Sequence, residues 1–126
     1  MKIRSASVLG TVFGTLSLAA TLGCGGGGGS PGSTMTLPVV DCTNPPTFAT
    51  VTIWPKCVVC HSTTLTGADR GGAPATVNFD DYTSAMANAM MAATDVQSGR
   101  MPKDGTAITE AEKQSLYAWA LCGTPR

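Results

Sequence analysis

Cys57-Val58-Val59-Cys60-His61 is the stretch of sequence that decides the fold. Its two cysteines are three positions apart, and the only histidine of the 126-residue chain follows the second cysteine directly. Residues three and four positions apart lie on the same side of a helical turn. The spacing therefore predicts that two thiols and one imidazole face a common target.

C-x-x-C-H is the attachment pattern of a c-type haem. Two thiols so spaced can add to the two vinyl groups on one edge of a porphyrin, and the imidazole of His61 can then bind the iron. Two alternatives remain open. A zinc site would borrow a fourth ligand from Cys42 or Cys122, and a redox-active dithiol would follow a strand in a βαβ unit. We expect one covalent haem.

A haem that carries electrons usually has a sixth iron ligand, and methionine is a common one. Four methionines follow the motif: Met86, Met90, Met91 and Met101. We expect Met101 to be the ligand, because Pro102 stiffens the loop after it. Met86 and Met90 are one helical turn apart, which is typical of core packing. Another methionine, a water molecule or an open iron site are the alternatives.

The N-terminal part has the pattern of an export signal. Residues 1–23 combine a basic start with a short apolar stretch, which predicts a signal peptide, with a retained anchor helix as the alternative. Gly23-Cys24 resembles a bacterial lipoprotein cleavage site, so we expect lipidation of Cys24; the alternative is ordinary cleavage. Residues 24–40 are glycine-rich and predict a flexible tether, and residues 41–126 form the predicted domain.

The charge of the chain argues against nucleic acid as a partner, and the remaining cysteines predict a disulfide. Without residues 1–23, 103 residues remain, with six basic and eight acidic side chains, and no basic patch suits nucleic acid. Cys42 and Cys122 are left over, one at each end of the domain. In an oxidising compartment we expect them to form a disulfide, with two buried thiols as the alternative.

With these motifs the chain resembles the class I cytochrome c family over residues 45–123. The resemblance depends on the C-x-x-C-H motif, on Arg100-Met101-Pro102, and on 109–113 (TEAEK), which opens a last helix. It implies a mostly α, cytochrome c-like domain wrapped around one haem. It further implies thioether bonds at Cys57 and Cys60, a proximal role for His61 and a distal role for Met101.

The resemblance also assigns a proline whose carbonyl accepts a hydrogen bond from the ring of the proximal histidine. Pro74 is similarly placed, although it can equally be an ordinary loop proline. Arg100, next to the expected ligand, can pair with a haem propionate or remain a solvated surface charge. Tyr82, Trp54 and Trp119 are expected to line the haem pocket.

The remaining elements follow from local patterns. We expect a helix over residues 78–93 capped by Asn78 or Asp80, loops over 62–77 and 99–107, and a last helix opened by a Thr109-x-x-Glu112 capping box. The Asp80-Asp81 pair is expected to supply negative charge at a helix N-terminus. Pro55 and its β-branched neighbours predict a short or distorted first helix.

These expectations favour a one-electron carrier in the cell envelope, not an enzyme. Its location would be the periplasm or the cell surface, its anchor a lipid in the membrane, and its partners other redox proteins. Two alternatives stay open: a haem-bearing accessory subunit, and a haem enzyme or sensor with an open iron site.

Overall fold

The computed structural model describes residues 36–126. The predicted signal peptide, Cys24 and most of the predicted tether lie outside these residues. The elements are, in chain order, 3-10 helix η1 (Phe48–Thr50), α1 (Trp54–Cys57), 3-10 helix η2 (Gly67–Arg70), α2 (Tyr82–Ala87), α3 (Ala89–Gln97) and α4 (Glu110–Leu121). Residues 36–126 contain no strand, which confirms the mostly α prediction. In this part of the chain, no helix is both long and apolar enough to span a membrane.

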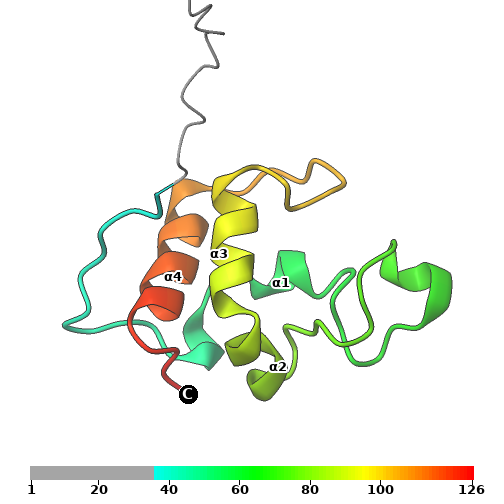
Figure 1. The fold of residues 1–126 in the computed structure, drawn as a ribbon, viewed down its shortest axis with the longest axis horizontal. Coiled ribbons are helices and arrows are strands. Elements are labelled where there is room, and N and C mark those ends of the chain that lie inside the picture. Colours follow the sequence, from blue (N-terminus) through cyan, green and yellow to red (C-terminus); the bar gives the residue numbers. More distant parts are fainter. Residues whose placement is uncertain (1–35) are drawn as a thin grey trace, which may run out of the picture. The chain divides into compact units, whose positions relative to one another are not determined.

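Helices α3 and α4 lie side by side and form the centre of the domain (Figure 1). The predicted capping box opens α4: Thr109 Oγ1 accepts from the Glu112 N–H, and the Glu112 carboxylate accepts from the Thr109 N–H. The Tyr117 hydroxyl of α4 donates to Gln97 Oε1 at the end of α3, 2.7 Å away. The two helices are thus joined by a side-chain hydrogen bond as well as by packing.

The helix expected over residues 78–93 is instead two helices that meet at Asn88. The backbone of Asn88 leaves the helical region, and its side chain donates to the Ser84 carbonyl. Asparagine competes with the helix for backbone hydrogen bonds, which explains the break. The N-cap of α2 is Asp81, which accepts from the Ser84 N–H, so the prediction of Asn78 or Asp80 as the cap was wrong.

Helix α1 is four residues long, as the prediction of a short first helix required. Pro55 lies in its first turn, where the missing N–H of proline leaves no bond unmade. Ile53 and Trp54 are buried, so the start of α1 is fixed in the core.

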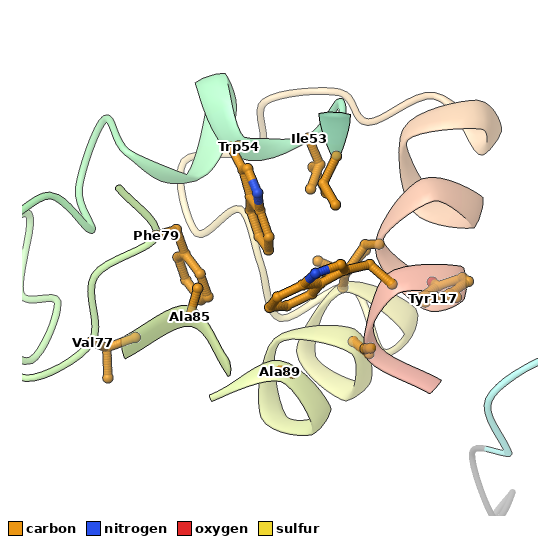
Figure 2. Close-up of a cluster of buried hydrophobic side chains, with 13 residues drawn as sticks. Ile53, Trp54, Val77, Phe79, Ala85, Ala89 and Tyr117 are labelled. Atoms are coloured by element: carbon orange, nitrogen blue, oxygen red, sulfur yellow. The ribbon is translucent and has the colours of Figure 1, made fainter. Parts of the chain in front are cut away.

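The core is a cluster of apolar and aromatic side chains from the four α-helices and the segments that join them (Figure 2). Trp54 stacks on Phe79 with ring centroids 5.2 Å apart and meets Trp119 edge-on at the same distance. Both indole N–H groups are satisfied by backbone carbonyls, those of Phe48 and Pro125 respectively. Aromatic pairs of this kind add about 0.5–1.5 kcal/mol each to the burial of their surface.

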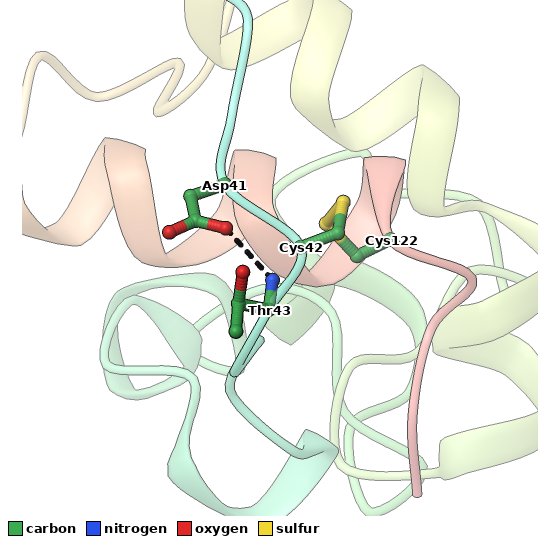
Figure 3. The surroundings of a disulfide bond; sticks show 4 residues. All are labelled: Asp41, Cys42, Thr43 and Cys122. Atoms are coloured by element: carbon green, nitrogen blue, oxygen red, sulfur yellow. Dashed lines mark hydrogen bonds between the residues drawn. A yellow bond between two sulfur atoms is a disulfide. The ribbon is translucent and has the colours of Figure 1, made fainter.

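The folded part begins before residue 41, the predicted boundary between tether and domain. Leu37 and Val40 are partly buried and pack against the core cluster. Two residues on, Cys42 forms a disulfide with Cys122 at the end of α4, as expected (Figure 3). The bond joins positions 80 residues apart and holds the entry of the chain against its last helix.

Removing this cross-link should destabilise the domain. In the chain-entropy account a loop of this length contributes about 4 kcal/mol, because the cross-link restricts the unfolded chain. We expect the double variant Cys42→Ser/Cys122→Ser to lose roughly that free energy of unfolding in urea titrations followed by tryptophan fluorescence. Reduced wild-type protein is the control and should behave like the variant. Equal stability of oxidised wild type and variant would contradict the account.

Candidate functional site

A cavity of about 600 Å³ lies beside the C-x-x-C-H turn. The four residues expected to bind the haem line it: Cys57, Cys60, His61 and Met101, the last from a loop forty positions later. Much of the remaining wall is apolar or glycine, and it also contains charged residues, among them the buried Arg70; the apolar and glycine part includes Val59, Gly71, Gly72, Phe79, Ala92, Val96, Ile108 and Leu116. The structure therefore brings the four expected haem-binding residues together around one space.

The backbone continues as a turn after α1 and sets the positions of the motif. The N–H groups of Cys60 and His61 both donate to the Cys57 carbonyl, at 3.3 and 2.9 Å. The bond from His61 is of the helical i to i+4 kind, so Cys57, Cys60 and His61 lie on one side of a single turn. Neither cysteine of the motif forms a disulfide, and both are partly buried.

The ring of His61 is held in one tautomer by a backbone carbonyl. Its Nδ1 lies 3.2 Å from the carbonyl oxygen of Val77. A carbonyl can only accept, so in the neutral ring Nδ1 carries the proton and Nε2 keeps a free lone pair. Such a bond is how proteins orient a metal-binding histidine.

The expected partner of this bond was Pro74, and the structure corrects that expectation. Pro74 lines the cavity, but its carbonyl accepts from Arg70 Nη2 at 2.7 Å. The physical reason is a turn after Pro74, in which the Val77 N–H donates to the Pro74 carbonyl. This turn brings the Val77 carbonyl to the ring of His61 in place of that of Pro74.

Of the four candidate methionines, Met101 and Met91 line the cavity. Met101 is partly buried and packs against the core, whereas Met91 is 46% exposed. Met86 and Met90 are 43% and 51% exposed, so the expectation that they pack in the core was wrong. The buried face of α2 and α3 carries Ala85, Ala89 and Ala93 instead, which keep helical spacing across Asn88.

The loop that carries Met101 is fixed by the end of α3. The N–H groups of Arg100 and Met101 both donate to the Asp95 carbonyl, and Gly99 takes the positive φ of 72° that the turn requires. Arg100 forms an ion pair with the Asp95 carboxylate, and its side chain is 66% exposed. Arg100 does not line the cavity itself, although its partner Asp95 does.

The aromatic residues also differ from expectation. Trp54, Trp119 and Tyr82 belong to the core or its edge and do not line the cavity. Phe79 does, between the stacked ring of Trp54 and the imidazole of His61, whose centroid is 5.3 Å away. Phe79 therefore packs the imidazole of His61 against the aromatic core.

Asp80 fixes the chain just after His61. Its carboxylate accepts from the hydroxyl of Ser62 at 2.6 Å and from both the N–H and the hydroxyl of Thr63 at 2.9 Å. Asp80 therefore ties the start of the following loop to the segment before α2. Of the predicted acidic pair, only Asp81 serves as a helix N-cap.

Arg70 is the site residue that sequence reasoning missed. It is 4% exposed, lines the cavity and donates to carbonyls along the loop 62–77. The sequence neighbours of Arg70 could have identified it. Arg70 is a charged residue next to two glycines in a loop of mostly small side chains, where a cation has few reasons to lie unless it organises the backbone.

A salt bridge holds α1 against α4 next to the motif. Lys56 Nζ donates to Glu112 Oε2 at 2.8 Å and to the Ala107 carbonyl at 2.6 Å. The bonds from Lys56 and from Thr109 lower the pKa of Glu112 to about 2. Burial, together with the Glu112 charge, raises the pKa of the Cys57 thiol to about 12, so that thiol keeps its proton at neutral pH.

The zinc alternative finds little support in these contacts, and residues 36–126 lack the strand after which the dithiol alternative would place the motif. Cys42 and Cys122, the cysteines that a zinc site would borrow, are bonded to each other. Within residues 36–126, no three His, Cys, Asp or Glu side chains are grouped to hold a metal ion. A haem iron bound by His61 and Met101 does not require such a group, because methionine and the porphyrin supply the other ligands.

The salt bridge between Lys56 and Glu112, which holds α1 against α4, predicts that the stability of the domain depends on pH. A carboxyl group whose pKa is lower in the folded chain stabilises fully above its ordinary value of 4.5, and this contribution is lost as the pH falls through about 2. We expect Glu112→Gln to be less stable than wild type at pH 6, with the difference shrinking towards pH 2, in urea titrations across that range. Glu110→Gln, an exposed carboxylate on the same turn, is the control and should change stability much less. A pH-independent difference for Glu112→Gln would contradict this role.

Comparison with known proteins gives no further lead. No family model, no curated protein and no solved structure matches the chain. The function is therefore inferred from the residues of the cavity and their geometry.

Proposed function

We propose that the protein is a mono-haem c-type cytochrome of the class I type, which acts as a one-electron carrier in the cell envelope. The observation that carries the proposal is the single cavity that joins the C-x-x-C-H turn to Met101. Two thiols, an imidazole and a thioether from distant segments share one mostly apolar space, which is the donor set that a c-type haem requires.

The residues present fit this group. A volume of about 600 Å³ lies within the range of roughly 300–1,000 Å³ that is usual for cofactor sites. Both motif thiols are reduced and on one turn, and the Val77 carbonyl leaves Nε2 of His61 with its lone pair. Apolar side chains such as Phe79, Val96 and Leu116 would cover the faces of a porphyrin.

Each residue would then have one task. Cys57 and Cys60 would hold the haem through thioether bonds, and His61 and Met101 would bind the iron from opposite sides. The apolar wall would exclude water, which favours the reduced, less charged iron. When bound, the haem supplies an iron that alternates between Fe(III) and Fe(II).

The proposal of a carrier, as opposed to an enzyme or sensor, depends on the second axial ligand. If Met101 binds the iron together with His61, the chain would supply both protein ligands and would leave no place for a substrate to coordinate. A carrier and an accessory subunit share this ligand set and differ only in their partners. The predicted signal peptide and lipidation of Cys24 would place the protein at a membrane surface, facing redox partners.

Reduced-minus-oxidised visible spectra test the axial ligands. We expect the wild type, produced with cytochrome c maturation, to show sharp reduced bands and the weak methionine–iron absorption near the red edge. Met101→Ala should lose that absorption, and Met91→Ala, the control on the same cavity, should keep it. Loss in Met91→Ala alone would assign the ligand to Met91. A methionine–iron absorption that both variants keep would assign the ligand to another methionine, a wild type without that absorption would favour an open site, and absence of haem would refute the proposal.

Two neighbouring glycines allow a matched test of the thioether at Cys60. Gly71 and Gly72 both have positive φ, but a Cβ on Gly71 would lie 3.3 Å from Cys60 Sγ, whereas one on Gly72 would meet only the end of Lys103 at 3.9 Å. Both alanine variants lose about 1–2 kcal/mol to backbone strain. In the haem-loaded protein we expect Gly71→Ala to lose more free energy of unfolding than Gly72→Ala, because a thioether cannot move aside. Equal losses in urea titrations would contradict a bond at this sulfur.

A further inference from the structure

Arg70 is a buried cation in the cavity wall, and within residues 36–126 all its hydrogen-bond acceptors are neutral. Nε donates to the Ala73 carbonyl, Nη1 to those of Ser62 and Leu65, and Nη2 to those of Pro74 and Val77 and to Asn78 Oδ1. A guanidinium has five N–H groups, and these six acceptors occupy all of them, because the two N–H groups of Nη2 are shared among three acceptors. The side chain is fixed, and its positive charge is not paired with a carboxylate in this part of the chain.

One of these acceptors is the carbonyl that also holds His61. The Val77 oxygen lies 2.9 Å from Arg70 Nη2 and 3.2 Å from His61 Nδ1. A carbonyl oxygen has two lone pairs and can accept both bonds at once. The guanidinium and the imidazole are therefore connected through a single oxygen atom.

We propose that Arg70 is a positioning residue for His61 that raises the reduction potential of the bound haem. The inference rests on the proposed function. The bond from the cation draws electron density away from the Val77 oxygen, which then accepts more weakly from His61. An imidazole that keeps its Nδ1 proton more firmly donates less charge to the iron, which disfavours Fe(III).

The charge itself acts in the same direction. A fixed positive charge beside the proximal ligand repels the additional charge of Fe(III) more strongly in an apolar cavity than it would in water. Arg70 cannot turn away to relieve this repulsion, because its N–H groups are bound to the loop. Both effects stabilise Fe(II).

A purely structural role is the alternative, in which Arg70 only ties the loop 62–77 together. The two roles respond differently to substitution. Arg70→Gln keeps amide donors but removes the charge, whereas Arg70→Lys keeps the charge and loses the planar fork. A structural role affects stability in both variants and leaves the potential unchanged. If Arg70 tunes the haem, Arg70→Gln lowers the reduction potential, whereas Arg70→Lys keeps most of the wild-type value.

The test is a spectroelectrochemical titration of the haem-loaded wild type and variants. We expect Arg70→Gln to shift the Fe(III)/Fe(II) equilibrium about tenfold towards Fe(III), which is about 59 mV for one electron. Arg70→Lys should retain most of the wild-type potential. Lys113→Met, which removes a positive charge paired with Glu110 away from the cavity, is the control and should shift the equilibrium less than twofold.

Several outcomes would overturn the inference. They are an unchanged potential in Arg70→Gln, an equal shift in Arg70→Lys, or an equal shift in Lys113→Met. If the wild type takes up haem with His61 and Met101 as ligands, any of these results refutes the role of Arg70 alone. A wild type without haem refutes the proposed function instead.

A second measurement needs no variant and covers the case in which Arg70→Gln does not mature. His61 is the only histidine, so its ring N–H gives one assignable NMR signal in the reduced wild type. We expect a coupling across the hydrogen bond to the Val77 carbonyl carbon, together with slow solvent exchange of the Arg70 Nη2 protons. Coupling to another carbonyl, or rapid exchange of those protons, would overturn the shared-carbonyl arrangement.

Discussion

Burial of Ile53 and Trp54 is the constraint on which the rest of the site depends. Helix α1 has only four residues, too few to be stable by its own hydrogen bonds. Trp54 packs against Phe79 and Trp119, and its indole N–H is bound to the Phe48 carbonyl, so the helix is fixed by its first residues. Cys57 ends this helix, and Cys60 and His61 follow on the next turn. The packing of Trp54 therefore also fixes the positions of these three side chains.

The rest of the cavity wall is positioned by hydrogen bonds. The loop of 62–77 has only one turn of 3-10 helix, and its carbonyls converge on the guanidinium of Arg70. The loop that carries Met101 is held by the Asp95 carbonyl near the end of α3, which accepts from the N–H groups of Arg100 and Met101. Packing thus positions the motif, whereas hydrogen bonds position the two loops that complete the cavity wall.

The sequence predicted local patterns better than the contacts between distant segments. The capping box at Thr109 and the pairing of Cys42 with Cys122 are present as expected, and the C-x-x-C-H motif and Met101 line one cavity. Pro74 and Arg100 were chosen by position along the chain. Their hydrogen-bond partners depend on how the loops fold back, which spacing alone does not determine.

Arg70 and Asn88 are two further residues whose hydrogen bonds the sequence pattern did not predict. Asn88 ends α2 through a side-chain bond to Ser84 that competes with helical periodicity. Arg70 binds carbonyls of residues 62 to 77, a set that exists only once the loop is formed. Met86 and Met90 share their helical spacing with the buried Ala85 and Ala89, so spacing alone did not determine which of the two faces enters the core.

The most direct test of the central claim is the intact mass of the protein produced with cytochrome c maturation. A covalent haem at Cys57 and Cys60 predicts a mass higher than that of the processed polypeptide by one haem, which persists after denaturation and acid extraction. Replacement of both motif cysteines by serine should abolish the increase, whereas the Cys42→Ser/Cys122→Ser variant should keep it. A wild-type mass equal to that of the polypeptide alone would contradict the account.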